Sequence, residues 1–337
     1  MKSEDRILLG HGSGGKLSHN LLSKLFLKYF QNEELSKLND AAVLQCQGES
    51  IIFSTDSFVV DPVFFPGGDI GKLAVCGTVN DLAVMGARPL YMSVGFILEE
   101  GFLFSDLETI LGSMRAMSEE AQVQIVTGDT KVVPRGVADK IFINTAGVGV
   151  PLRGAHPSGQ NAKPGDKIII NGYLADHGIT VMAKREGLEL DLELKTDSAP
   201  LNHMIIDLLK KIPEIHVLRD PTRGGVATTL NEIARQSQVG IKLSEKALPV
   251  SPKVSAVCEI LGLDPLYIAN EGKVIVITPA KHADKVMTVM KQNKYGKNSC
   301  MIGEVVDDPK SRVYMETLIG GQRMIEMLAG EQLPRIC

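Results

Sequence analysis

The stretch from Gly71 to Ala87 constrains the fold of this chain more than any other, because it is apolar on most sides and rich in small residues. This pattern predicts a helix that is largely buried. Asn80 and Asp81 lie in its apolar middle, where leaving a carboxylate bare costs several kcal/mol. We therefore expect Asp81 to be paired, hydrogen-bonded or bound to a cation.

The first half of the chain alternates strands and helices around this central helix. Arg88-Pro89 is expected to end the helix, because proline cannot continue one. Ser105 and Glu108 have the spacing of a capping box at the start of the next helix. Strands are predicted over residues 41–46, 50–55, 90–98, 123–126 (short and buried) and 140–150, and a helix over residues 105–121.

Residues 151–165 separate two halves of the chain, since they hold three prolines and three glycines. The second half again mixes both kinds of element. Helices are predicted over residues 176–185, 201–209, 224–235, 252–261 and 281–291, and strands over residues 167–170, 215–218, 240–243, 273–277 and 301–305.

Composition excludes several classes of protein. A formal charge of -4, 5% aromatic residues and no tryptophan give no basis for nucleic-acid binding. The five cysteines are widely spaced and form no C-x-x-C pair, which argues against a disulfide framework and a structural zinc site. We find no signal peptide and no apolar stretch of ~20 residues, so we expect a cytoplasmic protein that does not span a membrane.

A glycine cluster, Gly10 to Lys16, opens a helix near the start of the chain. It resembles dinucleotide- and phosphate-binding loops, but both need a strand before the first glycine, and Ile7-Leu8-Leu9 is a poor one. Glycines still allow backbone N–H groups to approach an anion at a helix start. We predict an anion cradle here, with a flexible arm as the alternative; its residues are Gly12, Ser13, Gly14 and Gly15.

Aspartates recur beside predicted strand ends, at Asp40, Asp56 and Asp129. Together with Asp81 they form a carboxylate set without histidine or cysteine companions at ligand spacing, which favours a hard cation such as Mg²⁺. Magnesium held by carboxylates usually also binds substrate phosphates, so we interpret the first half as a Mg-nucleotide site without a Walker loop. For any single aspartate, a turn or capping role is the common alternative.

The second half adds two motifs and an unusual tail. Arg219-Asp220-Pro221-Thr222-Arg223-Gly224-Gly225 leads into a helix and suits an anion, and Asn270-Glu271-Gly272-Lys273 precedes a strand. The chain closes on Pro334-Arg335-Ile336-Cys337, where proline prevents a helix. We expect this tail to be mobile and its thiol to visit more than one site; the alternative is a free surface cysteine.

These motifs, taken in order, resemble a known family. The motifs are Gly12-Ser13-Gly14-Gly15, Asn39-Asp40, Thr55-Asp56-Ser57, Gly77 to Ala87, Thr127 to Lys131, Asp220 to Gly225, Asn270-Glu271-Gly272 and Pro334-Arg335-Ile336-Cys337. The chain resembles, over essentially its whole length, the carbamoyl dehydratases of nickel-iron hydrogenase maturation. They belong to the superfamily of aminoimidazole ribonucleotide synthetase, selenophosphate synthetase and thiamine-monophosphate kinase. A selenophosphate synthetase is discounted, because its glycine-rich loop usually carries a cysteine or selenocysteine, whereas this one has His11.

The resemblance implies an α/β (α+β) fold of the aminoimidazole ribonucleotide synthetase type, with two domains. A glycine-rich arm and helix (residues 1–38) would precede an ATP-binding domain (39–152) whose sheet pairs across a homodimer. A mixed α/β domain (153–322) and a flexible tail (323–337) ending in Cys337 would follow.

The resemblance also implies an activity. A partner carbamoyltransferase would load a carbamoyl group onto the terminal thiol, and the protein would use ATP to dehydrate this S-carboxamide to a thiocyanate. The cyano group would then pass to iron on a hydrogenase maturation scaffold complex. Two alternatives remain open: an ATP-dependent enzyme of the superfamily that acts on a free small molecule, and a non-catalytic thiol carrier with a regulatory nucleotide site.

Roles are assigned on this basis. Cys337 is the carrier, and Arg335 is expected to raise its thiolate fraction slightly. Glu271 is the chosen base, with an acidic turn residue as the alternative. Lys131 would stabilise the transferring phosphoryl group, with a solvated loop lysine as the alternative. The expected metal ligands are Asp40, Asp56, Asp81 and Asp129, and the expected cofactor-binding residues are Gly12, Ser13, Gly14, Gly15, Asp56, Asn80, Asp81 and Thr130.

Overall fold

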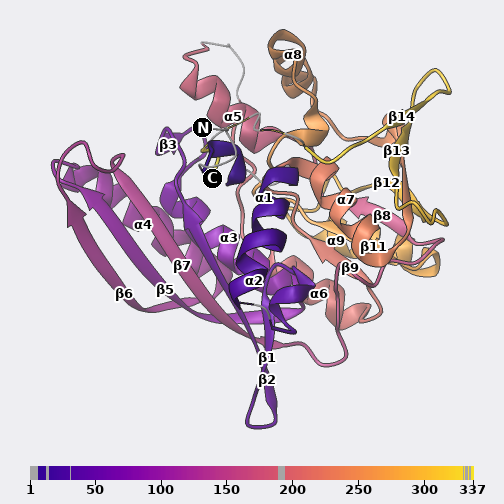
Figure 1. Cartoon of the computed structure of the whole chain (residues 1–337), viewed down its shortest axis with the longest axis horizontal. Coiled ribbons are helices and arrows are strands. Elements are labelled where there is room, and N and C mark those ends of the chain that lie inside the picture. Colours follow the sequence, from indigo (N-terminus) through magenta and orange to yellow (C-terminus); the bar gives the residue numbers. More distant parts are fainter. Residues whose placement is uncertain are drawn as a thin grey trace.

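The first half of the chain forms a five-stranded sheet with two helices on one face (Figure 1). The computed structural model describes residues 7–12, 15–30, 32–188, 194–328, 330, 333 and 335–337. The strands run in the order β1-β2-β7-β5-β6, antiparallel except for the parallel pair β5 and β6. They are β1 (Ala42–Cys46), β2 (Glu49–Phe58), β5 (Ala87–Glu99), β6 (Gln124–Val133) and β7 (Ile141–Pro151).

The central helix is α3 (Ile70–Val84), and 13 of its 15 residues are buried, which confirms the prediction from its apolar sequence. Asp69 caps its first turn, because its Oδ1 accepts hydrogen bonds from the amides of Gly71 (2.8 Å) and Lys72 (3.0 Å). Small residues let α3 lie close to the sheet: a Cβ on Gly77 would stand 2.9 Å from the ring of Phe58. Helix α4 (Phe104–Ala121) packs beside α3.

The two faces of this sheet differ in burial. Along β2, Ile52, Ser54 and Phe58 are buried on the face that α3 covers, whereas the alternating residues point the other way and are exposed. We call this second side the outer face. Its exposed apolar side chains include Phe53 (40% exposed) and Tyr91 (46% exposed), which lie in one row across the sheet.

The second half forms a mixed seven-stranded sheet, in the order β14-β13-β10-β12-β8-β11-β9. Only β10 and β13 are parallel among its neighbours within the described residues. Its strands are β8 (Lys167–Ile170), β9 (Val217–Arg219), β10 (Gly240–Ser244), β11 (Ile275–Thr278), β12 (Cys300–Val306), β13 (Val313–Glu316) and β14 (Gln322–Met324). Its helices are α5 (Asp176–Arg185), α6 (Asn202–Lys211), α7 (Gly225–Ser237), α8 (Pro252–Leu261) and α9 (Ala283–Gln292).

The N-terminal arm lies between the two halves in Figure 1. It consists of α1 (Gly15–Leu21), a π-helical segment η3 (Leu22–Phe26) and α2 (Leu27–Phe30). The Lys16 amide donates to the Leu328 carbonyl at 2.9 Å, which ties the arm to the last part of the chain. The short elements are η2 (Leu9–His11), η4 (Leu35–Lys37), β3 (Phe64–Phe65), β4 (Gly68–Asp69), η5 (Glu245–Ala247), η6 (Pro265–Tyr267) and η7 (Ala280–His282).

Every helix and strand predicted above is present, but four details were wrong or missed. Arg88 and Pro89 lie inside β5, where a shift in register next to Pro89 accommodates a residue without an amide hydrogen. Ser105 does not cap α4, whose N-cap residue is Leu103. Strand β6 is longer than predicted and is exposed rather than buried, because it is the edge of the sheet. Strands β3, β4, β13 and β14 were not predicted.

A search for membrane-spanning helices covered the described residues. None of those helices is long and apolar enough to cross a membrane.

Candidate active site

Four aspartates from both halves of the chain form one group, which we call the aspartate cluster: Asp40, Asp56, Asp81 and Asp220. Asp40 precedes β1, Asp56 lies in β2, Asp81 in α3, and Asp220 follows β9. Asp56 Oδ2 lies against α3, 3.5 Å from the position that a Cβ on Gly77 would take. Asp81 Oδ2 accepts a hydrogen bond from Ser54 Oγ at 2.6 Å.

Burial and mutual repulsion disfavour the charged forms of these carboxylates. Burial raises the pKa of Asp40 to about 6, in spite of the nearby Arg219. Burial and then the charge of Asp40 raise the pKa of Asp220 to about 8. Burial, Asp56 and Asp220 hold the pKa of Asp81 well above its usual value. The cluster is therefore short of positive charge, and a bound cation would relieve the repulsion.

Two arginines of the glycine-rich motif in the second half border the cluster. Arg219 forms ion pairs with Asp40 (2.8 Å) and with Glu232 of α7 (3.0 Å). Arg223 donates from a guanidinium nitrogen to the carbonyl of Gly12 at 2.7 Å. This hydrogen bond brings the N-terminal glycine cluster to the same site.

The glycine cluster itself is partly described. Gly15 begins α1 at a φ of +75°, and a Cβ there would stand 2.5 Å from the carbonyl oxygen of Leu328, so this position requires glycine. Ser13 and Gly14 lie outside the described residues. The anion cradle stays a prediction.

The thiol of Cys337 lies at the aspartate cluster. Burial raises its pKa to about 12, the nearby Arg223 opposes this shift, and Glu271, Asp56 and Asp220 add to it. At neutral pH the thiol is therefore protonated in this position. The cation that favours the thiolate is Arg223 and not Arg335, whose guanidinium is directed elsewhere.

The residues before the thiol are docked on both halves of the chain. Arg335 forms an ion pair with Asp139 and donates to the carbonyl of Val59 at 2.8 Å. The carbonyl of Arg335 accepts hydrogen bonds from the Asp61 amide (3.2 Å) and from Arg185 (2.7 Å). These contacts hold the end of the tail beside β2 and α5.

The last two residues are held as firmly. Ile336 is buried, and its carbonyl accepts a hydrogen bond from Nε2 of His177 at 2.7 Å. The main-chain oxygen of Cys337 accepts a hydrogen bond from the Val59 amide at 3.0 Å. The cavity that remains beside Ile336 and Arg223 measures only about 10 Å³, so the docked tail leaves little free space there. The structure thus describes a docked state, and mobility of the tail stays a prediction.

Glu271 lies next to the thiol and is 4% exposed. Burial, Asp220 and Asp197 raise its pKa well above the usual value. Within the described part of the chain, its Oε1 is buried without a hydrogen-bond partner. A carboxylate that is shielded from water and holds an unused oxygen is suited to removing a proton from a bound substrate.

Three predicted site residues lie apart from the cluster in one chain. Asp129 and Lys131 form an exposed ion pair at 2.6 Å on edge strand β6. Asp129, Gly95, Asn144 and Ser57 lie opposite one another on four neighbouring strands and form one row across the sheet. Side chains in one row point to the same face, and Ser57 is exposed on the outer face, so Asp129 also lies on the outer face. Thr130 is next to it in the same strand. The cluster lies on the opposite side, at α3.

Asn80 has a different use in the structure. Its Nδ2 donates to the carbonyl of Ala199 (3.0 Å) and its Oδ1 accepts from the amide of Leu201 (2.8 Å), both in a buried setting. The side chain thus binds a protein segment, and its assignment to a cofactor stays a prediction.

Other residues of the site were not assigned from the sequence. Asp220 and Arg223 belong to a motif that was predicted to bind an anion, but the sequence did not predict that this motif lies beside the aspartate cluster. His177 carried no sequence signal, since it is a single histidine at the start of a helix. Of the residues that the structure describes, no three His, Cys, Asp or Glu side chains are arranged to hold a metal ion.

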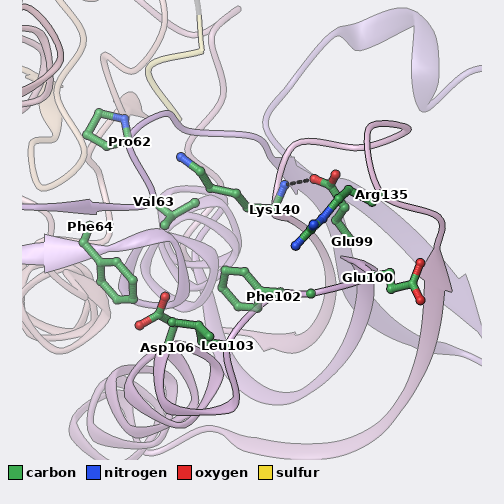
Figure 2. Close-up of a pocket in the computed structure, with 11 residues that line it drawn as sticks. Pro62, Val63, Phe64, Glu99, Glu100, Phe102, Leu103, Asp106, Arg135 and Lys140 are labelled. Atoms are coloured by element: carbon green, nitrogen blue, oxygen red, sulfur yellow. Dashed lines mark hydrogen bonds between the residues drawn. The ribbon is translucent and has the colours of Figure 1, made fainter.

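A cavity of about 450 Å³ is lined by Pro62 and Lys140, the chain neighbours of Asp61 and Asp139, which hold Arg335 (Figure 2). Its walls carry Val63, Phe64 and Phe102 as well as Glu99 and Lys140. No member of the aspartate cluster lines it, so we do not place the chemistry there.

Comparison with known proteins identifies the family. Residues 38–151 match the N-terminal domain, and residues 163–316 the C-terminal domain, of the AIR synthase related proteins. The chain is 51% identical to the carbamoyl dehydratase HypE of Azotobacter vinelandii over 327 residues, which cover 97% of this chain and 96% of that protein. It is 52% identical to a hydrogenase maturation protein HypE that was crystallised in complex with ATP (TM-score 0.83, 98% of this chain and 100% of that one). It is 49% identical to a chain in the crystal structure of a HypE-HypF complex (TM-score 0.87, 91% and 99% covered). These findings confirm the two-domain fold, and the chain belongs to the HypE family of carbamoyl dehydratases, in which the resemblance of its motifs had placed it.

Proposed function

We propose that this protein uses ATP to dehydrate a carbamoyl group carried on Cys337, giving a thiocyanate that supplies the cyanide ligand of nickel-iron hydrogenase. The observation that carries the proposal is that the Cys337 thiol lies near Glu271, Arg223 and two members of the aspartate cluster, Asp56 and Asp220. The relative that was crystallised with ATP supports the nucleotide requirement.

The reaction needs ATP because an amide oxygen is a poor leaving group. Transfer of the terminal phosphoryl group to the carbamoyl oxygen forms an O–P bond and releases ADP. Loss of both nitrogen-bound protons and cleavage of the C–O bond then give the S–C≡N group and inorganic phosphate. The water that the carbamoyl group loses leaves as part of that phosphate.

The aspartate cluster fits a magnesium ion. Its carboxylates are buried, repel one another and present oxygen ligands, which Mg²⁺ prefers. Asp40, Asp56 and Asp81, with Asp220, would hold it. A protein-only cage is not required, because Mg²⁺ usually takes few carboxylates and completes its shell with water and substrate phosphates. Bound there, the ion would neutralise charge on the phosphates of ATP.

Glu271 is the proposed base. Its raised pKa makes its carboxylate a stronger base than an exposed glutamate, and its burial excludes competing water. Arg223 lies near both Glu271 and the thiol and would stabilise negative charge that develops on the activated oxygen.

We place Asp129, Thr130 and Lys131 at the site of a second copy of the chain. In one chain Asp129 and Lys131 lie on the outer face, opposite to the aspartate cluster, and Thr130 lies between them on edge strand β6, so the three residues would reach a cluster only across a dimer. The exposed apolar side chains of the outer face support pairing of two sheets, as in the homodimer implied by the family.

A Phe53→Asp substitution is expected to separate such a dimer. The charge would be placed in the middle of the apolar outer face, where its burial against a second copy weakens association by about 30-fold or more in Kd. Light scattering after size-exclusion chromatography would report the mass of a monomer in place of a dimer. Leu318→Asp, at an exposed apolar hairpin tip away from this face, should leave the mass unchanged. A Phe53→Asp protein that keeps the mass of a dimer would contradict the assignment of this face.

The partner that loads Cys337 is proposed to be a carbamoyltransferase, and the crystallised HypE-HypF complex supports a stable encounter of this kind. The cyano group would then be transferred to iron on a hydrogenase maturation scaffold complex.

The function is tested by intact mass after incubation with the carbamoyltransferase, carbamoyl phosphate and ATP. With Mg²⁺ present, we expect the C-terminal peptide first to gain one carbamoyl group and then to lose one water. With EDTA added after loading, the carbamoyl adduct should persist and ATP turnover should stop. A loaded tail that never loses water under either condition would favour a non-catalytic carrier, and ATP turnover without any adduct would favour a small-molecule enzyme.

A further inference from the structure

One extended segment, residues 194–201, contacts α3, the loop that carries Glu271 and the histidine that holds the tail, and we call it the strap. Its middle is buried: Ser198 is 3% exposed and the side chain of Asp197 4%. The Thr196 amide donates to the carbonyl of Pro66 at 2.9 Å. Asn80 of α3 binds its far end, at Ala199 and Leu201. The strap is therefore fixed to the first half of the chain at two points.

Asp197 of the strap holds the loop that carries Glu271. Its Oδ1 accepts a hydrogen bond from the amide of Glu271 (3.2 Å), and its Oδ2 accepts one from the amide of Gly272 (3.3 Å). Lys273 forms a buried ion pair with Oδ2 at 2.7 Å. The fit is close, because a Cβ on Gly272 would stand 1.8 Å from the Asp197 carbonyl oxygen. Both hydrogen bonds thus fix the main chain of Glu271 while leaving its carboxylate free.

Thr196, the preceding residue, holds the tail through His177. Thr196 Oγ1 and His177 Nδ1 are 2.7 Å apart, and Nε2 of the same ring binds the Ile336 carbonyl at 2.7 Å. A carbonyl can only accept, so Nε2 carries the proton and Nδ1 accepts from the threonine hydroxyl. Burial lowers the pKa of His177, which keeps the ring neutral and this arrangement unchanged at neutral pH.

We propose that Asp197 is a positioning residue: through the strap, it sets the distance between the Glu271 carboxylate and the group carried on Cys337. This inference rests on the proposed function, in which Glu271 removes protons from that group. Neighbouring residues of one segment then fix the base and the tail relative to each other. A small error in such a distance slows a proton transfer strongly.

The test is the single-turnover rate of dehydration of the preloaded Asp197→Asn protein. Asparagine keeps the size of the side chain but puts an NH₂ group where an acceptor is needed and removes the charge that Lys273 neutralises. We expect about a 100-fold slower rate, with loading of Cys337 and ATP affinity unchanged. Asp166→Asn is the matched control: Asp166 is equally buried and binds His216 at 2.7 Å outside the site, so it should report only general destabilisation.

A double variant separates positioning from a purely structural role. If Asp197 acts through Glu271, Asp197→Asn should slow the Glu271→Gln protein by less than about threefold, because the group that it positions is already lost. The pH profile gives a second readout. Asp197 is among the charges that raise the pKa of Glu271, so its removal should lower that pKa and move the rising limb of the rate to lower pH.

Distinct outcomes would overturn the inference. A rate for Asp197→Asn close to the wild-type rate, or a full 100-fold loss that persists in the Glu271→Gln background, would show that Asp197 does not act through Glu271. If the wild-type protein formed no thiocyanate, or Glu271→Gln formed it at the wild-type rate, the proposed function would fail instead, and that result is visible without any Asp197 variant.

Discussion

A Cys337→Ala protein is expected to accept no carbamoyl group at all, because the carbon that becomes the nitrile is attached to the protein only through this sulfur. Intact mass after incubation with the carbamoyltransferase, carbamoyl phosphate and ATP should match that of the untreated chain. Coupled ATP turnover should fall to background as well, since ATP then has no amide oxygen to phosphorylate.

Cys46→Ala is the matched control for this experiment. Cys46 is an exposed free cysteine at the end of β1, so it is the thiol that a nonspecific reagent would reach first. Its alanine variant should load and dehydrate as the wild-type protein does. A carbamoyl adduct on the Cys337→Ala chain, or full ATP turnover by it, would mean that the substrate is carried elsewhere or is a free molecule.

A Glu271→Gln protein is expected to load Cys337 normally and then stall. Glutamine has the shape of glutamate but cannot take up a proton, so the rate of water loss should fall by about 10²- to 10⁴-fold, as for the removal of other general bases. The carbamoyl adduct would accumulate in the mass spectrum. Glu304→Gln, on β12 and paired with Lys167 at the surface, provides a control with unchanged rate.

The pH dependence follows from the shifted pKa of Glu271. A base works in its deprotonated form, and burial together with Asp220 and Asp197 raises the pKa at which that form appears. The wild-type rate should therefore rise with pH through a pKa well above that of an exposed glutamate, and Glu271→Gln should lose this limb. Thiocyanate formation by Glu271→Gln at the wild-type rate would assign the base to another residue.

The sequence predicted the parts of the fold that local pattern determines. The burial of α3 follows from a sequence that is apolar on most sides, and the structure also brings Asp40 and Asp56, predicted beside strand ends, close to Asp81 of this helix. Asp129 shows where such reasoning stops. It also lies in a strand, but which face a strand residue takes depends on register, and β6 shifts register opposite Met92 and Ser93.

The sequence also did not predict contacts between residues that lie far apart along the chain. Asp197 is 74 residues away in the sequence from Glu271, which it binds, and His177 is 159 residues away from Ile336. No local motif marks either Asp197 or His177. The start of β6 is exposed, although residues 123–126 are predicted to be buried because Val123, Ile125 and Val126 are apolar like the residues of a covered strand. That sequence is consistent with a partner sheet, which one chain cannot supply.

The way in which the tail is held has a consequence for the order of events at the sulfur. The described hydrogen bonds to residues 335–337 end on main-chain carbonyls and on the Arg335 guanidinium, so they are the same whether the sulfur is bare, carbamoylated or cyanated. These hydrogen bonds therefore do not distinguish one group on the sulfur from another. These hydrogen bonds favour the bound tail equally at every stage of the cycle, so any preference for retaining or releasing a finished nitrile must come from the contacts of the sulfur-bound group, from the nucleotide, or from a protein that competes for the same three residues.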